Sequence, residues 1–251
     1  MELALECPTT LLDKIQPLTD FYFALTHLVL SDPAYADYYA THHDKMLILD
    51  NSTNELGVPC SIDDILKAAE IIKPDIIVPP DHLCNMEKTI EDVRIFKKVG
   101  WEDERFVLPV IQGSTIKECY KCADKYVDMG FKQCAVPYDP TCTKEDTIQK
   151  MASQRQRVVV GLTARFEWVH LLGFTVFEEL QFYRSLGHGC RFSIDTGSPI
   201  MHGLKGIRFG RDPLLDKKKP TMDMMPSKWD SRDLSEVFYN LAFLRKELNG
   251  I

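Results

Sequence analysis

The chain has 251 residues, of which 45% are hydrophobic and 27% charged, and its formal net charge is −7. This length fits one large domain, and the negative charge argues against a protein that coats nucleic acid indiscriminately. No apolar run is long enough to span a membrane and no signal peptide is recognisable, so we expect a cytoplasmic protein without membrane contact. The eight scattered cysteines favour reduced, mostly structural thiols over a disulfide scaffold.

The first third of the chain predicts strands that alternate with helices. After a short polar lead, the apolar run 23–30 predicts a buried strand, and Ser-Asp-Pro at 31–33 predicts a helix start because proline is favoured in the first turn. A second strand is predicted at 46–49, a helix with acids in its first turn at 61–72, and a third strand at 75–78.

The alternation continues to the end of the chain. We predict helices at 86–99, 115–129, 144–153, 174–186 and 233–248, and strands at 105–111, 132–136, 157–160, 168–172 and 191–194. Together with the first three, these make eight strand candidates. They predict an α/β fold, a single (β/α)8 TIM-type barrel over residues 1–251, with an open doubly wound sheet as the alternative.

Polar residues recur where the predicted strands end. Asp50, Asp81 and Asp195 each follow a strand, as do Gln112-Gly113 and Gly161-Leu162. Each residue alone is explained by turn formation or helix capping. In a barrel, however, the carboxyl ends of the strands share one mouth, so together these residues predict a pocket with three carboxylates, one carboxamide and a glycine that lets backbone approach a ligand.

The ordered series resembles the tRNA-guanine transglycosylase superfamily, barrel enzymes that exchange guanine for a 7-deazaguanine. The resemblance covers roughly residues 46–203, and its order is more specific than any one segment. The matching segments are Leu49-Asp50-Asn51-Ser52, Pro80-Asp81, Val110-Ile-Gln-Gly113, Val160-Gly161-Leu162 and Asp195-Thr-Gly-Ser-Pro199.

The resemblance implies a role for each residue of the series. Asp195 would be the nucleophile that attacks the sugar C1′, and Asp50 the general acid/base or a second contact to the base edge. Asp81 would accept hydrogen bonds from guanine N1–H and N2–H2, whereas O6 would need a donor such as Gln112 or a backbone N–H near Gly161. Gly113 and Leu162 complete the substrate-binding set that the resemblance implies.

The chain departs from the family in three ways. No cysteine occurs beyond Cys190, so the family's zinc module has no counterpart, and Asn51-Ser52-Thr53 replaces a pair of glycines. Val160 also replaces the first glycine of the backbone-contact segment. The single CxxC pair, Cys119 and Cys122, lies in a predicted helix and is a poor zinc site. We therefore expect neither metal nor cofactor.

Reduced, zinc-free relatives of this kind resemble the phage and bacterial branch that places 7-deazaguanines in DNA. The expected partners are therefore DNA, with tRNA as the alternative, free guanine, and a 7-deazaguanine base such as preQ0. A phage-encoded protein would act in the host cytoplasm, and an oligomer is compatible with the sequence. Two other classes stay open, namely a non-catalytic barrel subunit that docks nucleic acid and an unrelated barrel lyase or hydrolase with paired acids.

A long loop at 196–232 is predicted between the last strand and the closing helix, and its part at 203–232 is basic. We expect this basic loop to bind phosphates through Lys205, Arg208, Arg211, Lys217, Lys218 and Lys219. His170, His188 and His202 fall near the same mouth, where unpaired histidines are more often polar packing than ligands.

Overall fold

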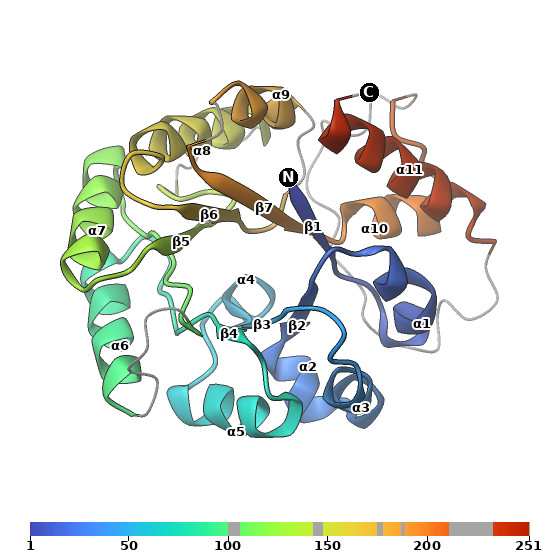
Figure 1. Cartoon of the computed structure of the whole chain (residues 1–251), viewed down its shortest axis with the longest axis horizontal. Helices are drawn as coiled ribbons and strands as arrows, with labels where there is room; N and C mark the ends of the chain where they lie inside the picture. Colours follow the sequence, from blue (N-terminus) through green and yellow to red (C-terminus); the bar gives the residue numbers. More distant parts are fainter. Residues whose placement is uncertain (100–105, 143–147, 175–177, 187–188, 211–232, 251) are drawn as a thin grey trace.

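The computed structural model describes residues 1–99, 106–142, 148–174, 178–186, 189–210 and 233–250. Parallel strands form an inner barrel and helices surround it (Figure 1). The predicted (β/α)8 barrel is confirmed.

The strands form two hydrogen-bonded groups. One has the order β1 (Glu2–Leu5), β7 (Arg191–Thr196), β6 (Trp168–Leu171), β5 (Gln133–Val136), and the other has the order β2 (Tyr22–Leu25), β3 (Leu47–Asp50), β4 (Ile76–Ile77). Parallel bridges from Ile77 to Val107 and from Val110 to Ala135 place 107–110 between β4 and β5. With this segment, which is fifth along the chain, the barrel has eight strand positions.

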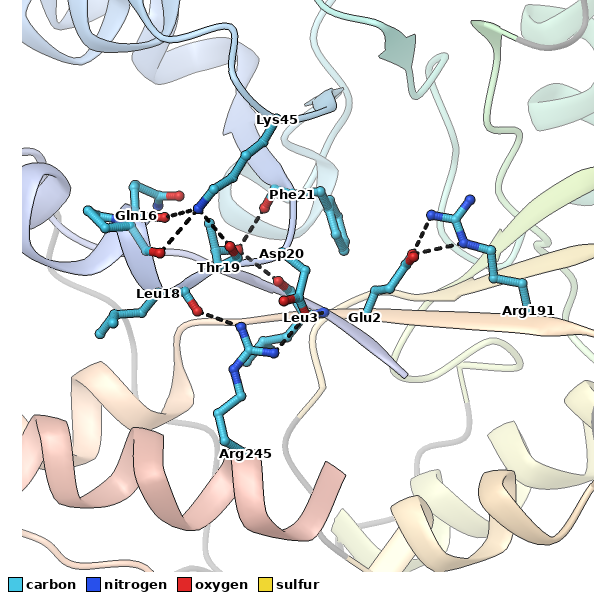
Figure 2. Close-up of polar contacts among 11 residues, drawn as sticks. Glu2, Leu3, Gln16, Leu18, Thr19, Asp20, Phe21, Lys45, Arg191 and Arg245 are labelled. Atoms are coloured by element: carbon cyan, nitrogen blue, oxygen red, sulfur yellow. Dashed lines mark hydrogen bonds and ion pairs between the residues drawn. The ribbon is translucent and has the colours of Figure 1, made fainter. Parts of the chain in front are cut away.

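Side chains close the barrel between β1 and β2 at its amino-terminal end. Figure 2 shows Asp20 beside Leu3, where the Leu3 N–H donates to the Asp20 carboxylate over 2.8 Å and the Asp20 N–H donates back to the Leu3 carbonyl over 2.7 Å. Lys45 donates to the carbonyls of Gln16 and Thr19 in the same cluster. The closure between β1 and β2 is therefore held by the loop before β2 rather than by a regular ladder of strand hydrogen bonds.

Helices follow each strand, and several begin at side-chain caps. Asp32, Ser61, Asn85 and Thr115 accept hydrogen bonds from the first-turn N–H groups of α3, α5, α6 and α7. The α-helices are α1 (Leu12–Ile15), α2 (Thr26–Ser31), α3 (Pro33–Thr41), α4 (Thr53–Leu56), α5 (Ile62–Ile72), α6 (Met86–Lys98), α7 (Ile116–Asp128), α8 (Ile148–Leu162), α9 (Glu178–Ser185), α10 (Ser198–Leu204) and α11 (Ser235–Asn249). In the described ranges, no helix is both long and apolar enough to cross a membrane.

Two strand predictions are wrong, although the number of strand positions is right. The first barrel strand is β1, which lies in the segment predicted to be a polar lead. The predicted strand 157–160 is instead part of α8, where Arg155, Val158 and Leu162 are buried while Val160 is 47% exposed. Burial at this spacing belongs to one face of a helix, so the three consecutive valines lie on a helix turn rather than in the barrel.

Two further boundaries differ from the prediction. The predicted strand 23–30 ends at Leu25, and α2 continues the same apolar run as a helix. The predicted loop 196–232 contains α10, which begins with Pro199 in its first turn and packs against α11. Gly203 allows this close packing, because a Cβ there would lie 2.5 Å from the Val237 backbone.

Candidate active site

A cavity of about 250 Å³ opens at the carboxyl ends of the strands, the end at which barrel enzymes carry their chemistry. Among the described residues, its lining includes no lysine, arginine or histidine but six carboxyl side chains: Glu6, Asp50, Glu55, Asp81, Asp139 and Asp195. The predicted aspartates at 50, 81 and 195 therefore do meet at one pocket. The strongly acidic lining favours a ligand that presents hydrogen-bond donors or positive charge.

Asp195 lies near the end of β7 and is 2% exposed. Its Oδ1 accepts hydrogen bonds from His170 Nε2 over 3.1 Å and from the Gly173 N–H, which also reaches Oδ2 over 3.0 Å. Burial opposes ionisation, but the hydrogen bonds from His170, Glu6 and Gly173 outweigh it and hold the pKa of Asp195 below its ordinary value. These hydrogen bonds therefore favour the ionised form of Asp195.

Asp50 ends β3 and is buried in the opposite electrostatic setting. Burial and the neighbouring carboxylates of Glu55, Asp81 and Asp195 raise its pKa well above the ordinary value. One hydrogen bond, from the Ser52 N–H to Oδ2 over 2.7 Å, works against this shift. Burial and the surrounding carboxylates thus favour the protonated form of Asp50.

Asp81 follows β4 and is held by two amide side chains. Asn51 Nδ2 donates to its Oδ1 over 2.7 Å, and Gln112 Nε2 donates to its Oδ2 over 2.5 Å. Burial nevertheless raises the pKa of Asp81. Gln112 is itself fully buried, receives the Cys84 N–H at Oε1 and does not line the cavity. Its observed role is to orient Asp81.

The predicted glycine contacts lie elsewhere. Gly113 is at a strand end, but its missing Cβ leaves room for the first turn of α7, 2.8 Å from Cys119 N, and it does not line the cavity. Gly161 and Leu162 end α8 in the outer layer, where a Cβ on Gly161 would lie 2.4 Å from Tyr120. Their predicted position at a strand end is wrong, because the strand assigned there is helical.

The backbone that lines the pocket in place of Gly161 and Leu162 follows β6. Leu172 and Gly173 follow β6 and line the cavity, and Gly173 has the left-handed φ of 62° that glycine adopts without strain. The sequence pattern missed Glu6 because β1 was not recognised, although an apolar strand followed by an acid is the same signal that marked Asp50. Glu55 lies on α4 and carried no such signal.

The basic residues give a mixed result. Arg208 forms an ion pair with Glu236 and lies over the Tyr239 ring, so its charge is already paired. Lys205 is exposed at the end of α10. Arg211 and Lys217 to Lys219 lie outside the described residues, as do His188 and most of the predicted loop.

A disulfide joins two loops at the rim of the pocket. Cys84, after β4, is bonded to Cys142, after β5, whereas the other six cysteines are free. The prediction of reduced thiols is thus wrong for this pair, which the sequence separates by 58 positions. Within the described residues, no three histidine, cysteine, aspartate or glutamate side chains gather as metal ligands.

Comparisons with known proteins support the fold. No protein-family model matches the chain, and no curated protein matches its sequence. Phosphoribosyl anthranilate isomerase, solved with a reduced deoxyribulose 5-phosphate derivative, is similar at a TM-score of 0.51 and 10% identity over 100% of both chains. The aldolase QR15 is similar at a TM-score of 0.50 and 10% identity over 78% of this chain and 89% of its own. At this identity the likeness shows a shared barrel fold.

Proposed function

We propose that the chain is a guanine-exchanging transglycosylase that acts on a polynucleotide through a covalent Asp195–sugar intermediate. The observation that carries the proposal is that two strand-end aspartates in one cavity have pKa values shifted in opposite directions, that of Asp195 lowered and that of Asp50 raised. Two carboxyl groups with pKa values shifted apart in this way suit glycosyl transfer through a covalent intermediate, in which one carboxylate is the nucleophile and one carboxyl group is the acid.

The residues would divide the reaction as follows. The Asp195 carboxylate attacks C1′ of the sugar while the Asp50 carboxyl protonates the departing guanine, which breaks the glycosidic bond and leaves a glycosyl ester on Asp195. An incoming 7-deazaguanine then loses its ring N–H proton to the Asp50 carboxylate and attacks C1′, which releases Asp195. Each step balances in charge and protons, and the product keeps the configuration of the substrate.

We assign base recognition to Asp81, beside the cavity wall that Leu172 and Gly173 form after β6. Asp81 is a cavity-lining acceptor that suits guanine N1–H and N2–H2, whereas adenine presents a different pattern. In place of Gly161 and Leu162, Leu172 and Gly173 after β6 form the backbone wall of the cavity, and their N–H groups are donated to the Val136 carbonyl and to Asp195. DNA is the favoured polymer and tRNA the alternative.

The test is base exchange itself. Purified protein is incubated with isotope-labelled guanine or with preQ0 and either DNA or tRNA, and the polymers are digested to nucleosides for mass spectrometry. We expect label in DNA and a trappable protein–oligonucleotide adduct. Release of guanine with water as the acceptor would instead indicate a paired-acid hydrolase. No adduct and no exchange with either polymer would favour a non-catalytic barrel and end the proposal.

A further inference from the structure

A continuous chain of hydrogen bonds runs through the barrel interior to Asp195 from the side away from the cavity. Trp168 Nε1–H donates to Ser193 Oγ over 2.7 Å, and Ser193 Oγ lies 2.8 Å from His170 Nδ1. His170 Nε2 in turn lies 3.1 Å from Asp195 Oδ1. All three partners come from β6 and β7, where His170 and Ser193 are paired in register.

The partners fix the tautomer of His170. Trp168 can only donate, so it occupies Ser193 as an acceptor and leaves the Ser193 hydroxyl hydrogen to be given elsewhere. Ser193 Oγ has a second lone pair, so the Trp168 contact alone does not set the ring. An ionised Asp195 can only accept and so requires a proton on Nε2, and in the neutral ring Nδ1 is then bare and accepts the Ser193 hydrogen. The ring proton is therefore on Nε2 and is donated to Asp195.

His170 has no route to a bound substrate. It is 0% exposed and does not line the cavity, and the rings of Phe21, Phe23 and Trp168 pack around it with centroids 5.9, 5.6 and 6.4 Å away. An imidazole in such apolar surroundings is costly unless its nitrogens are paired, and here both are. Its effect on chemistry must act through Asp195.

We propose that His170 is the positioning residue of the nucleophile, held in its Nε2–H tautomer by Ser193 and Trp168 so that Asp195 stays ionised and aimed at the cavity. The role given to Asp195 rests on the proposed transglycosylase activity, whereas the hydrogen-bond chain does not. Without His170, Asp195 would keep the Gly173 N–H and Glu6 but lose its side-chain donor from β6.

The kinetic test compares His170→Ala with His170→Gln, whose amide N–H can reach the place of Nε2. We expect His170→Ala to lower kcat about 10- to 100-fold with little change in KM, because a hydrogen bond to a charged group is lost. His170→Gln should recover most of that loss, and His202→Gln, a buried histidine in α10, should keep the wild-type rate.

The acid limb of the rate profile should also move to higher pH in His170→Ala. Glu6 and Asp50 also face Asp195, from β1 and β3, and stay in place in this variant. Wild-type kcat and an unmoved acid limb in His170→Ala would overturn the proposal.

A second measurement is independent of activity and decides the matter if His170→Ala does not fold. Nitrogen-15 NMR of the wild-type protein should show His170 protonated at Nε2 and bare at Nδ1. Ser193→Ala and Trp168→Phe should each convert this into a mixture of tautomers. A proton on Nδ1 in the wild type would refute the inference even if base exchange occurs. A fixed Nε2–H tautomer in a protein without exchange would instead count against the proposed function alone.

Discussion

The ends of β3 and β7 carry the same residue type at one cavity, yet the pKa of the carboxyl group is shifted in opposite directions at the two ends. Asp50 is surrounded by carboxylates and receives one backbone N–H, whereas Asp195 receives His170, Glu6 and Gly173. Both are nearly inaccessible to water. The donors and charges around a buried carboxyl, rather than its burial alone, therefore set the direction in which its pKa is shifted.

The largest expected effect comes from removing the charge at β7. Asp195→Asn should reduce base exchange by about a thousandfold or more and abolish the covalent adduct, because no nucleophile remains. Single-turnover exchange with labelled guanine measures this. A variant with wild-type exchange would refute the assignment of Asp195.

At β3 we expect a smaller loss of rate. Asp50→Asn cannot donate and recover the proton of the leaving base, so exchange should fall by about 100- to 10,000-fold. Because the nucleophile is intact, the adduct should still form slowly with an oligonucleotide that carries a good leaving group. Equal loss of adduct in both variants would remove the distinction between the two aspartates.

The same two variants should change stability in opposite directions. The pKa of Asp50 is raised in the folded state, so its contribution to the free energy of unfolding is present in acid and is lost as pH rises. The pKa of Asp195 is lowered in the folded state, so its contribution is present above the pKa of the unfolded chain and is lost in acid. At pH 7, Asp50→Asn should therefore raise, and Asp195→Asn lower, the free energy of unfolding by roughly 1 to 3 kcal/mol. Both differences should shrink near pH 4. Urea unfolding at the two pH values measures them.

Asp81 tests whether the pocket between these two ends recognises a purine. Asp81→Asn should weaken guanine binding about 10- to 100-fold, since an acceptor for guanine donors becomes partly a donor. Gln112→Ala should have a smaller effect in the same direction, because Gln112 acts only by orienting Asp81. Calorimetric titration with guanine checks both. Unchanged affinity in Asp81→Asn would remove that residue from the site.

The smallest effects separate the two glycines. Gly173→Ala strains a left-handed backbone position and disturbs the N–H that holds Asp195, so we expect exchange to fall about tenfold. Gly161→Ala should leave exchange unchanged, because the nearest atoms that a Cβ there would meet belong to the Tyr120 side chain in the helical layer. A loss of exchange in Gly161→Ala alone would contradict this assignment of the two glycines.

Much of the site could be predicted because the pattern that defines a barrel also marks its mouth. Asp50, Asp81 and Asp195 stand directly after apolar segments, and such segments end together in an α/β barrel. The strand prediction at 157–160 is wrong because three consecutive valines suit a buried strand. The burial of Arg155, Val158 and Leu162 at helical spacing appears only in the packed structure. Glu6 was not predicted because the four residues of β1 are too short a run to identify as a strand.

The sequence by itself determined the fold class and the order in which three aspartates reach one end of the barrel, since both follow from local alternation of apolar and polar segments. Only the tertiary structure decided which strands close the barrel, that Gln112 faces Asp81, and that Leu172 and Gly173 replace Gly161 and Leu162 at the pocket. It alone also decided that the pKa of Asp50 is raised and that of Asp195 lowered, because the pKa of a buried carboxyl depends on donors and charges that the fold brings from distant parts of the chain.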